Sequence, residues 1–367
     1  MTKPLSATTK SPPAKLARAV EWMRHYLYRL HQRLTPAPAA MMEMIVATWT
    51  SQAITVAAQL GVADALTGGP LPIEELAAQV GADADALRRL LRALIGKGIF
   101  RRRHDGRYEL NSLAGTLRSD APISMTWAAQ FYGLAEQRER WTLMADSIRT
   151  GRSVVPALRG KESFDYFAGQ PELAELFDQT MTSVSQLTDG PVVTGYDFGA
   201  YATIVDVGGG HGPLLAAILA GAPASRGVLY DLPRVVANAP TLFREHNVAD
   251  RVRIAEGSFF DSVPDGGDAY ILKNIIHDWP DELAVQILRN VHRAAGPAAT
   301  VLLVELVIPD HDRDFPGKWV DLEMLLNLGA RERTAAEYRD LLSQAGFQLT
   351  RVVQTASPLS VIEARAA

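Results

Sequence analysis

The second half of the chain alternates short apolar runs with longer segments of helical character. This pattern begins after Tyr201 and is typical of a parallel, doubly wound α/β sheet. Two apolar runs near the end lie close enough together to form an antiparallel hairpin at the sheet edge. We therefore assign 196–367 to an α/β domain. Its predicted strands are 203–207, 227–230, 252–255, 269–272, 300–307, 347–353 and 359–363.

The first half is predicted to be mostly helical. Between residues 15 and 34, apolar side chains recur at spacings of four and three, which places them on one helical face, with basic residues on the others. Pro36 ends the helix, and the stripe is too short for a coiled coil. We expect packing on the chain itself or on a second subunit rather than on a membrane surface. The stripe consists of Leu16, Val20, Met23, Leu27, Leu30 and Leu34.

A winged-helix pattern follows a helical region at 40–66. Helices are predicted at 73–80 and 85–97, and then a two-strand ribbon that turns at Asp105-Gly106. Three arginines, Arg101 to Arg103, could suit DNA, but the net charge is -4 and nucleic-acid binding usually leaves a basic footprint. We therefore expect these arginines to be a solvated edge and the partner not to be nucleic acid.

The remaining segments complete the predicted domain organisation. Residues 1–14, which are rich in Ser, Thr, Pro and Lys, are predicted to be a disordered lead. Residues 15–120 form an N-terminal helical and winged-helix-like domain. Residues 121–195 form an aromatic-rich helical linker that we expect to help line a substrate pocket, because domain junctions favour small-molecule sites.

Composition restricts the possible chemistry. The 367 residues include no cysteine, which excludes disulfides, thiolate nucleophiles and cysteine-ligated metal sites. The amino terminus has no apolar signal region, and no run approaches the roughly 18 apolar residues that suggest a spanning helix. We expect a cytoplasmic protein.

A glycine-rich loop joins the first predicted strand to a helix at 213–219. It contains Asp206, Gly208, Gly210 and Gly212 at alternate positions. A dinucleotide fingerprint would need a glycine where Pro213 stands, and no Gly-Lys-Ser/Thr of a phosphate loop follows. The acid-x-Gly-x-Gly-x-Gly form is instead that of an S-adenosylmethionine loop, which has no pyrophosphate to bind.

Asp231 ends the second predicted strand, 21 residues after Gly210. This is the usual distance from such a loop to the carboxylate that accepts hydrogen bonds from a ribose diol. An Asp at a strand end is by itself more often a turn or cap residue. Following this loop, Asp231 is predicted to bind the ribose.

These motifs together resemble those of the large, metal-independent small-molecule O-methyltransferases, a family of plant caffeate-type and bacterial polyketide-tailoring enzymes. The resemblance covers nearly everything after residue 40, and several motifs in the same order make it specific. Its markers are 206–212, Tyr230-Asp231-Leu232-Pro233, Gly257-Ser258-Phe259-Phe260, 273–279, Glu305 and Arg331-Glu332-Arg333-Thr334.

The resemblance implies a class I methyltransferase sheet, a homodimer formed through the N-terminal domain, and S-adenosyl-L-methionine as the cofactor. It also implies that Ser258 and Phe259 flank the adenine and that Lys273 helps to hold the cofactor. Many relatives have Asp where this chain has Ser258, so the bond to the adenine is expected to differ. The expected cofactor-binding residues are Asp206, Gly208, Gly210, Asp231, Leu232, Gly257, Ser258, Phe259 and Lys273.

His277 is the predicted general base. It follows the fourth strand at its carboxyl end, where open α/β sheets bind ligands, and a neutral imidazole can accept the proton of a phenol. A carboxylate would fix its tautomer. We expect Glu305 in that role, with Glu332 as second candidate, although Glu305 could be a buried ion-pair partner and Glu332 part of a charged loop.

The predicted reaction is methylation of a hydroxyl on a small aromatic molecule of phenol, quinone or polyketide type, with no metal. N-methylation is the nearer alternative, and a relative that has turned to hydroxylation or decarboxylation is another. The acceptor itself is not identified by these residues. By resemblance, the expected pocket residues are Phe177, Met181, Trp279, Met324 and Asn327.

Overall fold

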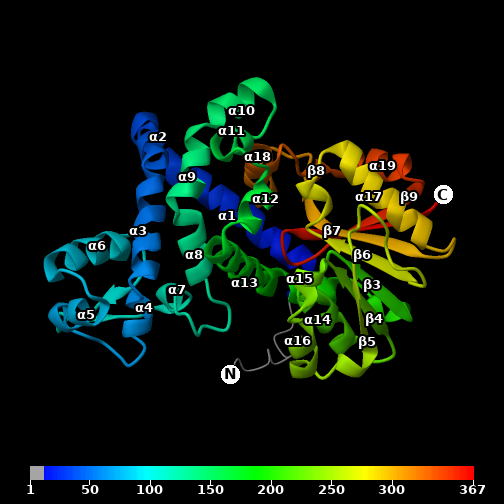
Figure 1. Ribbon diagram of the computed structural model, residues 1–367. Helices are drawn as coiled ribbons and strands as arrows, with labels where there is room; N and C mark the ends of the chain where they lie inside the picture. Colours follow the sequence, from blue (N-terminus) through cyan, green and yellow to red (C-terminus); the bar gives the residue numbers. More distant parts are fainter. Residues whose placement is uncertain (1–11) are drawn as a thin grey trace. The chain divides into compact units, whose positions relative to one another are not determined.

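The computed structural model describes residues 12–367, so most of the predicted disordered lead lies outside the described residues (Figure 1). The chain divides into two compact units. Unit 1 contains Tyr26–Thr142 and Phe164–Gln186, and unit 2 contains 12–25, Leu143–Ser163 and Leu187–Ala367. In the described part, no helix is both long and apolar enough to cross a membrane. The finer predicted domain boundaries stay predictions.

Unit 2 is built on an eight-stranded sheet, whose order β5-β4-β3-β6-β7-β10-β9, with the eighth strand β8 paired to β7 off this row, confirms the predicted α/β fold (Figure 1). The first five of its strands in chain order are parallel, and β9 and β10 form the predicted antiparallel hairpin. The strands are β3 (Thr203–Val207), β4 (Arg226–Asp231), β5 (Val252–Glu256), β6 (Ala269–Lys273), β7 (Thr300–Ile308), β8 (Arg333–Thr334), β9 (Phe347–Gln354) and β10 (Leu359–Ala366).

Helices cover both faces of this sheet, which explains why its strands are almost continuously apolar. Successive residues point to opposite faces: Ile204 packs with α14 and α16, whereas Val205 packs with α17 and α19. The helices of unit 2 are α10 (Met144–Thr150), α11 (Val155–Arg159), η1 (Phe198–Ala200), α14 (Pro213–Gly221), α15 (Pro233–Val236), α16 (Ala239–Glu245), η2 (Ala249–Arg251), η3 (Ile276–Asp278), α17 (Asp281–Ala294), α18 (Pro316–Leu328) and α19 (Ala335–Gln344).

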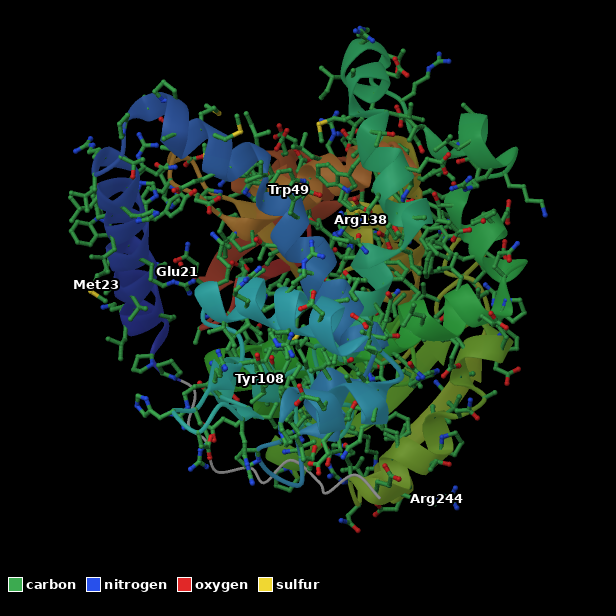
Figure 2. The ribbon with its side chains drawn as sticks, turned by 90° about the vertical axis from the view of Figure 1, so that its left-hand side faces the viewer. Glu21, Met23, Trp49, Tyr108, Arg138 and Arg244 are labelled. Carbon is green, nitrogen blue, oxygen red and sulfur yellow. The ribbon has the colours of Figure 1, made fainter. Side chains whose placement is uncertain are left out.

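Unit 1 contains the predicted winged-helix elements. Its core joins Leu76, Leu91 and Phe100 around the two central helices, and Arg138 on α9 donates hydrogen bonds to α3 (Figure 2). The elements are α2 (Ala37–Ile45), α3 (Ala47–Gln59), α4 (Val62–Ala65), α5 (Ile73–Val80), α6 (Ala84–Gly96), β1 (Arg101–Arg102), β2 (Tyr108–Glu109), α7 (Ser112–Gly115), α8 (Thr126–Gly133) and α9 (Ala135–Thr142). The helices α1 (Ala14–Arg33), α12 (Ser163–Ala168) and α13 (Pro171–Gly195) have residues in both units.

Two of the three arginines that could have suited DNA are paired with carboxylates. Arg101 forms an ion pair with Glu109, Arg103 lies 3.6 Å from Asp105, and Arg88 on α6 bonds Asp85 at 2.9 Å. Each pair neutralises part of the positive potential that phosphate binding requires. The hairpin therefore has the character of the solvated edge expected from the sequence.

Helix α1 confirms the amphipathic pattern predicted for residues 15–34. It buries none of its residues, and every member of its apolar stripe is exposed. Figure 2 shows Met23 and Glu21 on opposite sides of the helix. The last turn is tied to α2, since His31 lies 3.7 Å from Glu43 and Gln32 reaches the sulfur of Met44.

Candidate active site

The loop between β3 and α14 runs over the carboxyl edge of the sheet. Gly208 has φ 70° and Gly210 φ 62°, in the left-handed region that favours glycine. A Cβ on Gly208 would lie 2.6 Å from Ile275, whereas nothing lies within 4 Å of the corresponding position on Gly210. The loop therefore packs closely at one end and leaves open space above Gly210.

Asp231 at the end of β4 is held against this loop. Its Oδ2 accepts a hydrogen bond from the amide of Gly210 at 2.9 Å, and its Oδ1 accepts one from the amide of Leu232 at 2.7 Å. Three predicted cofactor residues from two neighbouring strands are thus brought together. Ribose binding by Asp231 stays a prediction.

The segment after β5 adds the other predicted adenine neighbours. The amide of Gly257 donates to the carbonyl of Asp231 at 3.1 Å, and a Cβ on Gly257 would lie only 2.4 Å from the hydroxyl of Tyr230. Ser258 accepts a bond from the amide of Phe260. The ring of Phe259 meets that of Trp279 edge-on at 6.2 Å, which fixes the ring beside the glycine loop.

Lys273 ends β6 and forms a buried ion pair with Asp189 of α13. Asp206 is 1% exposed, and its Oδ2 has no hydrogen-bond partner among the described residues. Burial raises the pKa of Asp206 to about 7, and the ammonium of Lys273 opposes this. Asp189 was not predicted as a site residue, because an acid inside a long helix has no motif around it.

The backbone turn after β6 places His277. Asn274 has φ 53°, a left-handed conformation that Asn tolerates better than most residues, and its amide donates to the carbonyl of Val304 on β7. The chain then enters the short helix η3, which contains His277. The histidine consequently sits at the carboxyl edge of the sheet, as expected for a residue that acts on a ligand.

The partner of His277 is Glu332, which corrects the preference for Glu305. The His277 Nδ1 lies 2.7 Å from Glu332 Oε1. Glu305 instead accepts hydrogen bonds from the amides of Ile275 and Ile276, at 3.2 and 2.9 Å, so it holds the backbone of the histidine loop. Adjacency of β6 and β7 was predicted correctly, but the Glu305 carboxylate bonds the loop amides, and the hydrogen bond to the His277 ring comes from Glu332.

The histidine lies in a strongly anionic setting. Donor atoms of His277, Glu305 and Glu332 all lie within 4.8 Å of one another, and Asp278 Oδ1 is 3.4 Å from His277 Nε2. Burial would lower the pKa of His277, but the carboxylates of Asp278, Glu305 and Glu332 outweigh it and raise the pKa to about 10. Burial also raises the pKa of Asp278 to about 6. The site therefore provides an unusually basic imidazole.

The predicted pocket residues are divided between the two units. In unit 1, the ring of Phe177 stacks on Phe167 at 5.3 Å, and Met181 lies further along α13. In unit 2, Ser163 donates to both oxygens of Asn327. Trp279 and Met324 also belong to this unit. A common pocket for these residues stays a prediction.

This arrangement fits S-adenosylmethionine. The glycine loop offers open space, the carboxylate of Asp231 lies beside it, and the unpaired oxygen of Asp206 can accept a bond from an ammonium group. No lysine or arginine cradle for a pyrophosphate follows the loop. The fold and the site define a class I methyltransferase that uses S-adenosylmethionine.

The chain belongs to the O-methyltransferase family. Residues 141–348 match the family's O-methyltransferase domain, and residues 42–120 match the O-methyltransferase dimerisation domain. Among curated relatives, phenazine O-methyltransferase PhzM of Lysobacter antibioticus is 41% identical over 90% of this chain and 96% of its own length. The 8-amino-8-demethylriboflavin N,N-dimethyltransferase of Streptomyces davaonensis is 36% identical over 84% of this chain and 89% of its own.

Solved structures agree with the fold. The crystal structure of LaPhzM has a TM-score of 0.86 and 41% identity, covering 91% of this chain and all of that one. The O-methyltransferase NcsB1 from neocarzinostatin biosynthesis was solved with S-adenosylmethionine and 2-hydroxy-5-methyl naphthoic acid. It has a TM-score of 0.74 and 34% identity, covering 87% of this chain and 96% of that one.

Proposed function

We propose that this enzyme methylates a hydroxyl group of a small aromatic molecule, with His277 as the general base. The observation that carries the proposal is the 2.7 Å contact between His277 Nδ1 and the buried carboxylate of Glu332. A proton on Nδ1 is then directed to Glu332, and Nε2, which lies 3.4 Å from Asp278 Oδ1, is the nitrogen that accepts the proton of the acceptor hydroxyl when the ring is neutral. Relatives named as acting on phenazine and naphthoate substrates support an aromatic acceptor.

The chemistry needs little more than positioning and a base. S-adenosylmethionine, when bound, supplies a methyl group on a positively charged sulfur. The acceptor oxygen would form the new bond to that methyl group as the sulfur–methyl bond breaks and S-adenosylhomocysteine leaves, and His277 would take up the oxygen's proton at Nε2. The carboxylates that raise the pKa of His277 also make its neutral ring a stronger acceptor for the proton of a phenol.

The decisive experiment is calorimetric titration with S-adenosylhomocysteine, followed by a screen of phenols, hydroxyquinones and hydroxyphenazines in the presence of EDTA. Micromolar binding and O-methylated product in EDTA would support the proposal, including the absence of a metal. Activity that EDTA removes and a divalent metal restores would overturn the metal-free reaction. Binding without methylation, but with hydroxylated or decarboxylated product, would assign the repurposed chemistry instead.

An amine acceptor is the second candidate, and it is favoured by the similarity to the riboflavin N,N-dimethyltransferase. A neutral amine attacks without prior loss of a proton, so N-methylation would depend only weakly on His277. Paired acceptors that differ only in OH or NH2 at one ring position separate the two reactions. Preference for the amine, with activity retained after loss of His277, would replace the O-methylation proposal.

We further infer that the enzyme is a homodimer whose interface includes the C-terminal half of α1 together with α2 and α3. Residues 42–120 match the dimerisation domain, and the apolar side chains of this surface are exposed in the single chain. A group of large exposed apolar side chains favours an interaction site, and the last turn of α1 is tied to α2. The surface consists of Leu27, Leu30, Leu34, Met41, Ile45 and Trp49.

Leu27→Glu is therefore expected to weaken the dimer by about 100-fold, because a carboxylate would be buried in an apolar contact. Sedimentation velocity across a concentration series measures the dissociation constant. Leu113→Glu is the matched control, since Leu113 is another leucine of unit 1 and is 52% exposed but lies on α7, outside the surface. Equal effects of the two substitutions would contradict the assigned interface.

A further inference from the structure

The strongest feature that the proposed mechanism does not use is the buried guanidinium of Arg333. This side chain is 1% exposed, although arginine is seldom fully buried. It follows Glu332 directly and lies in β8, whose backbone pairs with the end of β7 at Val307. Its position is therefore fixed by the same sheet that carries Glu305.

Arg333 binds the histidine loop from both sides of His277. Nη1 donates to the carbonyl of Ile276 at 3.0 Å, and Nη2 donates to the carbonyl of Trp279 at 2.9 Å. Nε and Nη2 also bond the carboxylate of Asp281, at 3.0 and 2.6 Å. The two carbonyl groups belong to the residue just before the histidine and to the residue two positions after it. One planar guanidinium therefore bridges the segment that carries His277.

Only arginine can make this set of contacts. Its planar guanidinium directs donors along several fixed directions, whereas a lysine ammonium is a single point charge on a flexible stem. An apolar side chain of similar length would leave the carbonyl of Ile276 without its buried partner. The ionic half of the arrangement matters less, because the side chain of Asp281 is 53% exposed.

The opposite side of the loop is bound as well. Glu305 accepts hydrogen bonds from the amides of Ile275 and Ile276, while Arg333 binds the carbonyls. Glu332 is itself fixed, because its amide donates to Asp321 Oδ1 at 2.9 Å. Movement of Arg333 would therefore change the distance between His277 on η3 and its partner Glu332 in the neighbouring loop.

We propose that Arg333 is a positioning residue for methyl transfer, which holds His277 in line with its carboxylate partner by binding both flanking carbonyl groups. This inference rests on the proposed role of His277. It assigns Arg333 an effect on the rate of the chemical step and none on cofactor binding, because its contacts lie on the histidine loop and not on the glycine loop.

The test compares Arg333→Met, Arg333→Lys, Asp281→Asn and the exposed neighbour control Arg331→Met. Arg333→Met is expected to lower kcat about 100-fold, with the KM for the acceptor and the affinity for S-adenosylhomocysteine within about threefold of wild type. Arg333→Lys should recover less than a tenth of the lost rate. Asp281→Asn and Arg331→Met should remain within about threefold in kcat.

Chemical rescue separates positioning from general stability. In Arg333→Ala, guanidinium at concentrations far below those that unfold proteins should restore part of kcat, and ammonium should not. If Arg333→Met does not fold, the Lys variant and the rescue decide the result. Unchanged kcat in a folded Arg333→Lys variant, or kcat loss matched by equal loss of S-adenosylhomocysteine affinity, would overturn the inference.

Failure of the Arg333 inference can be distinguished from failure of the proposed role of His277. A fully active His277→Ala enzyme would remove the base and with it the role of Arg333. An inactive His277→Ala enzyme beside a normal Arg333→Lys enzyme would remove only the positioning role. The pH profile gives an independent readout, because loss of alignment with Glu332 should move the acid limb of kcat/KM to lower pH.

Discussion

His277→Ala is expected to lower kcat by about 1,000-fold while leaving the affinity for S-adenosylhomocysteine unchanged. The imidazole lies 2.7 Å from Glu332 Oε1, and its loss removes the proton acceptor without touching the glycine loop or Asp231. Without a base, the acceptor must lose its proton to water or react as the minor ionised form. Steady-state kinetics with a phenolic acceptor and calorimetry with S-adenosylhomocysteine measure the two quantities.

His104→Ala is the matched control, since His104 lies exposed in the turn of the β1–β2 hairpin. It should behave as wild type in both measurements. Retention of more than a tenth of the wild-type kcat in His277→Ala would remove the base assignment. Raising the pH should partly restore the His277→Ala rate, because a phenol that ionises in solution needs no base.

The sheet was predictable from the sequence because its strands are buried on both faces and bounded by turns. The glycine loop after β3 and the acid after β4 predicted which edge of the sheet binds the cofactor, because the carboxyl ends of parallel strands lie on the same side. Helix α5 was predicted at its observed bounds, Ile73–Val80, because Gly81 ends it in a left-handed conformation. These features depend on residues that are close together in the sequence, so short sequence patterns predict them well.

Contacts between distant segments were not predictable in the same way. The sequence placed Glu305 beside His277 through strand adjacency, but it could not tell that the carboxylate would be occupied by two loop amides. Glu332 reaches His277 because the two-residue strand β8 pairs with β7, and two residues show no periodicity. Asp189 was not predicted, and Arg333 was recognised only as part of a motif without a role, because their partners are 84 and 52 to 57 residues away along the chain.

Glu332→Gln is expected to lower kcat at least 100-fold, because an amide cannot replace the carboxylate that orients Nδ1 and stabilises the protonated ring. Glu305→Gln is the matched control: the same chemical change on a neighbouring carboxylate whose oxygen can still accept the bonds from Ile275 and Ile276. It should cost less than about tenfold. A larger loss in Glu305→Gln than in Glu332→Gln would restore the partner that the sequence had favoured.

The pH dependence of kcat/KM should also differ between the wild-type enzyme and Glu332→Gln. A general base works only when neutral, so wild-type kcat/KM should rise with pH toward the raised pKa of His277, which is about 10 in the free enzyme. Burial lowers that pKa and three carboxylates raise it, so removing the charge of Glu332 leaves burial less opposed and lowers the pKa. The Glu332→Gln profile should therefore level off at lower pH and at a smaller maximum. Because both enzymes are compared with one acceptor, its own ionisation cancels. If kcat/KM of Glu332→Gln rises over the same pH range as in the wild type but reaches a lower maximum, Glu332 orients the ring without contributing to its basicity.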